Sequence, residues 1–440
     1  MYKLISSLSL VLLMGCSTVS TNSYAVSTAS LAQRDLQTAE KTAANGGFVV
    51  NEAKQLLEFC IELNNQDDRG KSNDSQFQAK PEGWKIVFDS RNPANHDWNK
   101  KFPKPANGAA DPNNPETNGF GPFNNAWLLL KSDTDPTQYA IAIRGTVGEI
   151  NSIMADAFVT TISAQNGISL KDEKLLPITF AATPEAELHS GFAYAVFTML
   201  FEKDLGILRK LHDVGLPENA KLFITGHSQG AAIATLVHSF LYYALTDPND
   251  RYQLKLHLKD GDKEGIQLKS YFFAQPKPAN LQYAEDFARI SKDMSYTINN
   301  SLDPVPQVPL TIQFASEVTG GVAVENAGKG KLVDKVLFKE LEWAADKLKK
   351  LRNDIAQRSA DHVKERFEAK KVNLDLHYFD GEPSAAKIPV NSLNYTLAGQ
   401  LIPLFGIDKG GDLYPIGKDK DVLLQHHATS YRKLIQQQIK

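Results

Sequence analysis

One serine of the sequence lies in a setting typical of a catalytic nucleophile. Ser228 is at the centre of Gly226-His227-Ser228-Gln229-Gly230. A Gly-x-Ser-x-Gly pentapeptide presents its serine on a tight turn when a strand precedes it and a helix follows it. Residues 221–225, with an apolar run at 222–224, predict such a strand, and the small residues after Gly230 predict such a helix. Because the pentapeptide alone arises by chance in roughly one chain in ten of this length, this context carries the prediction that Ser228 is the nucleophile of a serine hydrolase.

A nucleophilic serine needs a base, and the base needs an acid that orients it. In a strand–turn–helix site of this kind, the acid and then the histidine follow the serine along the chain. Asp303 is the candidate acid because it lies in a loop directly after a predicted strand at 294–299. Among the histidines that follow, His426 and His427 lie at the start of a predicted C-terminal helix, where a loop could deliver the base. Both remain candidates on this argument.

The hydrophobic pattern predicts the elements that position these residues. Two apolar runs, 126–130 and 139–143, are joined by a turn and predict a β-hairpin. Apolar residues at helical spacing over 332–367 predict one or two long amphipathic helices in an insertion at about 314–379. The remaining strands and helices alternate, which predicts an α/β fold with a mostly parallel central sheet and helices on both faces. These elements cover 51–65 (helix), 84–89 (strand), 222–225 (strand), 230–245 (helix), 268–274 (strand), 281–290 (helix) and 294–299 (strand).

Several separated segments of the sequence resemble the class 3 lipases, the α/β-hydrolases typified by fungal triacylglycerol lipases. The resemblance covers about residues 126–310 and the terminal histidine segment, and it implies an α/β-hydrolase fold that acts on carboxylic esters. The segments that carry it are Ala140–Thr146 with its Arg-Gly-Thr turn, His189–Phe192, the Gly226–Gly230 turn, Phe273–Pro276 and Asp303–Pro309.

The resemblance also implies roles for single residues. Asp303 would be the triad acid. An aromatic residue usually follows the base by a few positions in this family, so a spacing of five before Tyr431 selects His426 and a spacing of four selects His427. We favour His426. The backbone N–H groups of Thr146 and Gln229 would form the oxyanion hole.

Two segments could cover the site. Residues 150–163 follow the turn after which this family keeps its lid, and they form a short amphipathic run that predicts either a lid or a plain crossover helix. The insertion at about 314–379 could form a cap over an acyl pocket.

The N-terminus predicts export and lipidation. Lys3 and the apolar run 4–13 are typical of a secretory signal, and the run is shorter than the ~20 apolar residues that cross a bilayer. Leu13-Met14-Gly15-Cys16 resembles the lipobox of bacterial lipoproteins, in which the signal is cleaved before the cysteine and the thiol is lipidated. An ordinary cleaved signal is the alternative. Ser17, in place of an aspartate, favours the outer membrane by the sorting rule of Gram-negative lipoproteins.

The predicted organisation is therefore a signal peptide over 1–15, a Ser/Thr/Ala-rich tether over 16–46 that begins at the lipidated Cys16, and a hydrolase domain over 47–440. A net charge of −3 gives no reason to expect a nucleic acid as partner, and two cysteines cannot build a disulfide framework. No metal or cofactor is expected, and the oligomeric state stays open.

The function predicted from the sequence is a lipid-anchored lipase or esterase of the bacterial cell envelope, at its periplasmic or surface face, that cleaves triacylglycerol-type or other acyl esters. A phospholipase or lysophospholipase is the first alternative, and a catalytically silent surface-binding protein is the second.

Overall fold

The computed structural model describes residues 47–63, 79–92, 119–120, 125–145, 161–165, 178–202, 204–261, 263–309, 311, 394–407 and 423–439. Four features predicted above lie outside these residues: the signal peptide (1–15), Cys16 with the tether (16–46), Thr146, and the insertion (314–379).

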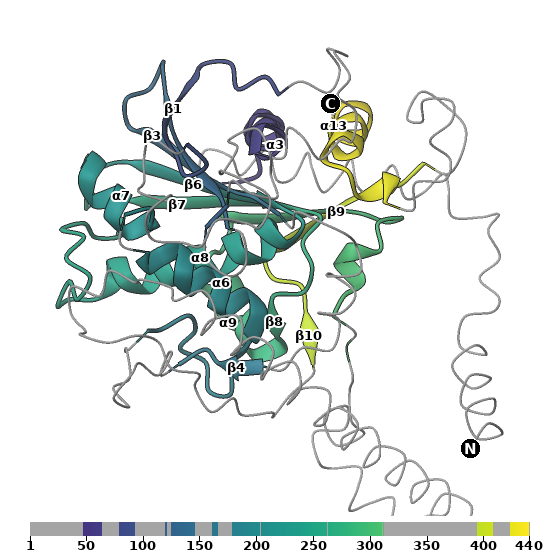
Figure 1. Ribbon diagram of the computed structural model, residues 1–440. Coiled ribbons are helices and arrows are strands. Elements are labelled where there is room, and N and C mark those ends of the chain that lie inside the picture. Colours follow the sequence, from purple (N-terminus) through teal and green to yellow (C-terminus); the bar gives the residue numbers. More distant parts are fainter. Residues whose placement is uncertain are drawn as a thin grey trace, which may run out of the picture.

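A seven-stranded sheet in the order β1-β2-β3-β6-β7-β9-β11 forms the centre of the molecule (Figure 1). The strands from β3 to β11 run parallel, whereas β1 and β2 run antiparallel to their neighbours. The pair β2–β3 is the predicted hairpin, and the mostly parallel sheet is confirmed. The strands are β1 (Trp84–Asp89), β2 (Trp127–Ser132), β3 (Gln138–Ile143), β6 (Lys221–His227), β7 (Gln267–Phe273), β9 (Ser295–Asn300) and β11 (Gln400–Leu404).

Helices cover both faces of this sheet, as predicted (Figure 1). The helices α3 (Val50–Leu63) and α13 (Ala428–Gln438) lie on one face, and α6 (Ser190–Phe201), α8 (Gln229–Thr246) and α9 (Leu281–Ile290) lie on the other. A further helix, α7 (Ile207–Val214), packs against α6.

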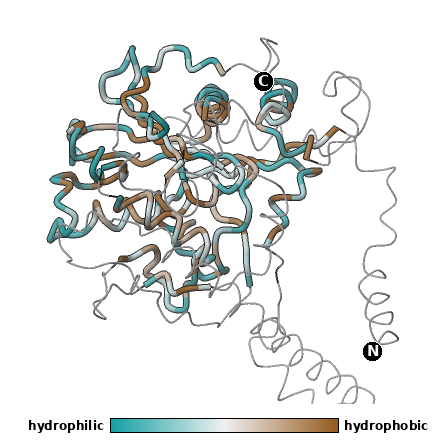
Figure 2. The backbone as a smooth tube through the Cα atoms, viewed as in Figure 1, coloured by the Kyte–Doolittle hydropathy of each residue, from teal (hydrophilic) through white to brown (hydrophobic). Residues whose placement is uncertain are grey.

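The core is divided by the sheet into two layers, because successive side chains of a strand point to opposite faces. Ile141 packs toward α6 and α8, whereas Ala140 and Ala142 pack toward α3 and α13. Strands that are buried on both faces have near-continuous apolar sequences, which explains why the β3 and β6 segments were predictable. Figure 2 shows hydrophobic residues along the central strands and the helices packed on them, with hydrophilic residues on the outer loops.

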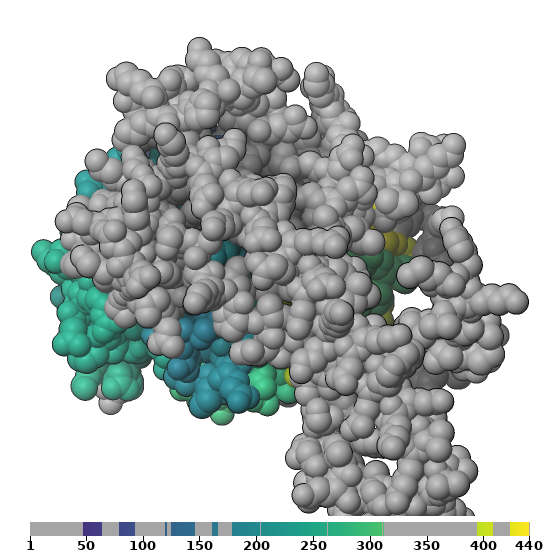
Figure 3. Space-filling view, turned by 60° about the horizontal axis from the view of Figure 1, so that its bottom comes forward, coloured from purple at the N-terminus to yellow at the C-terminus, as the bar shows by residue number. Residues whose placement is uncertain are grey.

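A second, smaller sheet in the order β10-β8-β5-β4 lies beyond α9 and was not predicted. Figure 3 brings this side forward and shows described residues between 161 and 187, in blue, at the surface. The first strand of this small sheet, β4, occupies the last three residues of the predicted 150–163 segment, so these three are not helical. The rest of that segment lies outside the described residues. The strands are β4 (Thr161–Ser163), β5 (Glu187–His189), β8 (Ala279–Asn280) and β10 (Tyr395–Thr396).

The last strand, β11, was also missed. It pairs in parallel with β9 and forms one edge of the large sheet. Pro403 lies within it, and a proline is tolerated at a sheet edge because its missing N–H removes no ladder hydrogen bond there. In the described part of the chain, every helix is too short or too polar to span a bilayer.

Candidate active site

Ser228 lies on the turn between β6 and α8 with the backbone angles φ 61° and ψ −136°. A positive φ is uncommon for a residue with a side chain and costs of order 1–3 kcal/mol. Two backbone hydrogen bonds hold the turn: the Ser228 N–H donates to the Phe273 carbonyl at 3.0 Å, and the Ser228 carbonyl accepts from the Ala231 N–H at 2.8 Å. The strained serine is thereby fixed at the carboxyl end of β6.

The glycines of the pentapeptide are required by close packing. A Cβ atom on Gly226 would lie 2.2 Å from the carbonyl oxygen of Gly230, and a Cβ on Gly230 would lie 2.3 Å from that of Ile143. Both distances are impossible for real atoms, so α8 can start directly against β3 and β6 only with glycine at these positions. The small residues that follow on α8, including Ala231, are fully buried.

The turn brings Ser228 to Asp303 and His426. His426 Nε2 lies 2.8 Å from Ser228 Oγ, and His426 Nδ1 lies 2.8 Å from Asp303 Oδ2. A carboxylate only accepts, so Nδ1 carries the imidazole proton and Nε2 is left to accept from the serine hydroxyl. The three residues are 1–6% exposed, and water therefore screens their interactions weakly.

These residues come from segments that are distant in the sequence but adjacent at one edge of the sheet. Ser228 follows β6, and Asp303 follows β9 at the same edge. His426 ends the short 3-10 turn η6 (Leu424–His426), which lies beside β9 just before α13 (Figure 1). His427 occupies the N-cap position of α13, and the bonds to Ser228 and Asp303 are both made by His426.

Two further donors hold the Asp303 carboxylate. Tyr431 Oη donates to Asp303 Oδ2 at 2.7 Å, and the Val305 N–H donates to Oδ1 at 2.9 Å. The Tyr431 hydroxyl also accepts from the Asn300 N–H at 3.0 Å. Burial, reinforced by the charge of Asp303, raises the pKa of Tyr431 well above its usual value, so the hydroxyl stays protonated and remains a donor. From the sequence, Tyr431 helped only to choose between His426 and His427 by their spacing from it, and its bond to Asp303 was not predicted.

His227 is a second residue whose role the sequence did not indicate. Its Nε2 lies 2.7 Å from the main-chain carbonyl oxygen of His426. Its ring lies 4.8 Å from the His426 ring and meets Tyr431 edge-on at 5.7 Å, measured between centroids. Burial, and then the proximity of the His426 imidazole, lower the pKa of His227 well below its usual value, so the His227 imidazole is neutral at physiological pH.

The predicted oxyanion residues are Gln229 and Thr146. Gln229 is the first residue of α8, where backbone N–H groups point out of the helix and the helix dipole is positive. Thr146 lies outside the described residues, but Gly145 directly before it lies against the nucleophile. A Cβ on Gly145 would be 3.1 Å from the Cβ of Ser228. An anion at Ser228 would therefore be close to the start of α8.

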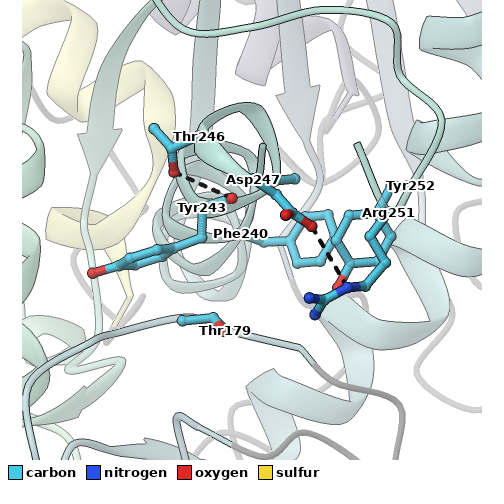
Figure 4. A pocket seen from close by; sticks show the side chains of 8 residues that line it. Thr179, Phe240, Tyr243, Thr246, Asp247, Arg251 and Tyr252 are labelled. Atoms are coloured by element: carbon cyan, nitrogen blue, oxygen red, sulfur yellow. Dashed lines mark hydrogen bonds and ion pairs between the residues drawn. The ribbon is translucent and has the colours of Figure 1, made fainter. Parts of the chain in front are cut away.

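A cavity of about 260 Å³ lies elsewhere, at the C-terminal end of α8 (Figure 4). The 18 residues of α8 rise about 27 Å, so this cavity is remote from Ser228. Its rim includes the ion pair of Arg251 with Asp247, whose Nε and Oδ2 are 3.5 Å apart. The lining residues are Thr179, Phe240, Tyr243, Ala244, Thr246, Asp247, Arg251 and Tyr252. Within the described ranges, His, Cys, Asp and Glu side chains form no group of three or more that could hold a metal ion.

The sequence of residues 140–313 matches the family model of class 3 lipases. This segment of the chain is therefore similar to the class 3 lipase family. The segment spans β3 to the loop after Asp303 and includes the Ser228 turn. The match indicates a serine ester hydrolase, and it supports the hydrolysis of lipid esters at the level of the family. The resemblance deduced from the sequence and the α/β-hydrolase fold are both confirmed.

Solved lipase structures are similar to the chain at low identity. M37 lipase is 18% identical over 62% of this chain and 68% of that chain, with a TM-score of 0.36. The Rhizomucor miehei triacylglyceride lipase is 15% identical over 59% and 74%, with a TM-score of 0.34. Lip2 lipase from Yarrowia lipolytica is 16% identical over 59% and 73%, with a TM-score of 0.36. No curated protein matches the chain.

Proposed function

We propose that this protein hydrolyses acyl esters of lipids, of the triacylglycerol type or related esters, through an acyl-enzyme on Ser228. The observation that carries the proposal is the continuous hydrogen-bonded chain from Ser228 Oγ through His426 to Asp303, with both distances at 2.8 Å. A nucleophile, its base and the orienting acid in this order are the working parts of acyl transfer.

In the acylation half, Ser228 Oγ attacks the ester carbonyl carbon while its proton passes to His426 Nε2. The Asp303 carboxylate stabilises the imidazolium that forms. The N–H groups of Gln229 and Thr146 stabilise the tetrahedral oxyanion, and one such donor is typically worth ~3 kcal/mol. When the C–O bond to the leaving group breaks, the imidazolium returns its proton to that oxygen and an alcohol departs.

In the deacylation half, a water molecule takes the place of the alcohol. His426 Nε2 removes a proton from the water as its oxygen attacks the acyl carbonyl carbon. The second tetrahedral intermediate then collapses, the bond to Ser228 Oγ breaks, and the proton returns to the serine. The fatty acid leaves, and the enzyme regains its starting protonation state.

Replacement of Ser228 by alanine tests the mechanism. Ester turnover by Ser228→Ala should fall to the level without enzyme, and a fluorophosphonate probe should label the parent protein at Ser228 but not the variant. Ser239→Ala is a matched control, because Ser239 is a buried serine of α8 whose hydroxyl is bonded to Tyr283. Unchanged turnover by Ser228→Ala would show the mechanism to be wrong, and a parent protein that takes up no probe would favour the silent binding protein.

The lipid class is tested separately, because phospholipase and lysophospholipase reactions use the same steps. A panel of triacylglycerols, diacylglycerols, phospholipids and lysophospholipids of varied chain length should be compared by kcat/KM on a variant that lacks residues 1–46. A preference for neutral glycerides of at least about tenfold, or roughly 1.4 kcal/mol, is the expected result. The reverse preference would establish the phospholipase alternative.

We also propose lipidation at Cys16 and attachment to the outer membrane of the bacterial envelope. Cys16 is one of two cysteines in the sequence, and the other, Cys60, is buried in α3. Cells expressing the full chain should incorporate labelled fatty acid into the parent protein and into Cys60→Ser, but not into Cys16→Ser. Equal labelling of Cys16→Ser would contradict the anchor, and fractionation of the membranes would decide the location.

A further inference from the structure

His227 connects the nucleophile strand directly to the base. The bond between its Nε2 and the His426 carbonyl oxygen, 2.7 Å long, joins residues 199 positions apart and is buried. A carbonyl oxygen can only accept, so Nε2 carries the proton and donates. His227 is therefore the Nε2–H tautomer, opposite to the tautomer that the triad requires of His426.

The two ends of this bond differ in how firmly the backbone holds them. His227 is the last residue of β6, which is hydrogen-bonded to β3 on one side and to β7 on the other. His426 ends a three-residue 3-10 turn, in which its own N–H donates to Leu423. The His227 side chain thus connects the backbone of the base, His426, to the strand that carries the nucleophile.

The bond has a specific consequence if the mechanism proposed above holds. In the acyl-enzyme, Ser228 Oγ carries the acyl group and has no proton to donate, so His426 loses its bond to the serine. Asp303 still holds Nδ1, but one hydrogen bond leaves the ring free to tilt about that contact. The bond from His227 to the His426 carbonyl remains and limits movement of the base while Nε2 must face the incoming water.

We propose that His227 is a positioning residue that holds the main chain of His426 in place throughout the cycle, and above all during deacylation. Its neutrality fits this role. Burial and the neighbouring His426 both hold the pKa of His227 low, so it adds no charge beside the imidazolium that forms at the base.

Two substitutions separate the hydrogen bond from the packing. His227→Phe keeps a flat ring and removes the donor, whereas His227→Gln keeps an N–H at the same number of bonds from Cα as Nε2. His238→Phe is the matched control. His238 is also buried and hydrogen-bonded, through Nδ1 to Ser270 Oγ at 2.9 Å, but it lies on the opposite face of the sheet from α13.

Stopped-flow hydrolysis of a p-nitrophenyl ester measures acylation and deacylation in one trace. We expect His227→Phe to lower kcat about tenfold, the rate equivalent of one hydrogen bond, and to lower KM together with kcat, because slower deacylation lets the acyl-enzyme accumulate. Deacylation should slow more than acylation, so the burst of p-nitrophenol should grow relative to the steady state. His227→Gln should recover most of kcat, and His238→Phe should leave both rates unchanged.

The proposal is overturned if His227→Phe keeps its kcat, if His227→Gln is as impaired as His227→Phe, or if His238→Phe loses rate equally. Should His227→Phe fail to fold, His227→Asn replaces it, because its shorter side chain cannot bring an amide to the His426 carbonyl. Failure of the proposed function is distinct, because the parent protein would then show no acylation of Ser228 at all.

Discussion

Replacing Asp303 with asparagine should hold His426 in the tautomer that cannot take the proton of Ser228. The Val305 N–H lies 2.9 Å from Asp303 Oδ1, so this position needs an acceptor. The amide oxygen of an asparagine must therefore take it, which leaves the NH₂ group at the Oδ2 position. That group would donate to His426 Nδ1, and the imidazole proton would move to Nε2, where it faces the serine.

The magnitude follows from the donors around the carboxylate. Among the described residues, Oδ1 accepts from the Val305 N–H, whereas Oδ2 accepts both from His426 Nδ1 at 2.8 Å and from Tyr431 Oη at 2.7 Å. The tyrosine hydroxyl can rotate to accept from the new NH₂ group, but its own hydrogen then loses the Oδ2 acceptor, which costs about 1–3 kcal/mol. The variant should therefore fold with a lower stability, and its main loss should be in catalysis. A wrong tautomer of this kind costs about 10⁴-fold in kcat in serine proteases, or about 5.5 kcal/mol.

The assay is steady-state hydrolysis of a soluble ester together with the rate of fluorophosphonate labelling of Ser228, for Asp303→Asn and the parent protein. Both rates should fall by a similar factor, because both need the serine proton to leave, while KM should change little and the urea midpoint should fall by the equivalent of the lost tyrosine bond. If Asp303→Asn retains kcat within about tenfold, Asp303 does not orient the base, and the acid assigned to the site is wrong.

Tyr431→Phe should lower stability by about 2–3 kcal/mol in urea unfolding, because it removes a charge-assisted bond to Asp303 and leaves the buried Asn300 N–H without its acceptor. A urea midpoint equal to that of the parent protein would contradict these contacts. Glu52→Gln should cost about 3 kcal/mol at neutral pH, since the Lys269 ammonium, 2.6 Å from the Glu52 carboxylate and almost fully buried, would lose its counter-charge. Burial tends to raise the pKa of Glu52, but Lys269 and a second lysine outweigh it and hold the pKa below its usual value. The Glu52 carboxylate therefore stabilises the fold fully at any pH above the usual pKa of a glutamate. This contribution is lost as the pH falls through the lower pKa that Glu52 has in the folded state. The difference in urea midpoint between the parent protein and Glu52→Gln should shrink from neutral pH to about pH 3, and a difference independent of pH would show that the charge of Glu52 contributes nothing.

The parts of the fold that could be predicted share one physical property. β6 and α8 are buried almost throughout. Buried elements need apolar or small residues along their whole length, so their sequences show a long and recognisable pattern. β8 and β10 are two residues long, and β4 and β5 are three. Such short strands exist only because a partner strand is present in the folded chain, and no local pattern indicates them.

The order of the strands along the chain was enough to predict two residues of the site. Ser228 and Asp303 each follow a strong strand, so the edge of the sheet at which they lie follows from the topology. The choice between His426 and His427 depends on the turn instead. The backbone is still in the 3-10 turn at His426 and becomes extended at His427, with φ −60° and ψ 138°. A change of this kind sends adjacent side chains in different directions, and only the three-dimensional structure specifies it.

The contacts that the sequence could not indicate belong to side chains that bind backbone. Asn300 donates through Nδ2 to the Gln425 carbonyl at 2.9 Å, and His227 donates to the His426 carbonyl at 2.7 Å. Both bonds join the turn that carries the base to a strand end that precedes a triad residue, and neither uses a triad side chain. The position of His426 is therefore set before Ser228 and Asp303 engage it, which is the condition for a base that must serve two half-reactions in one geometry.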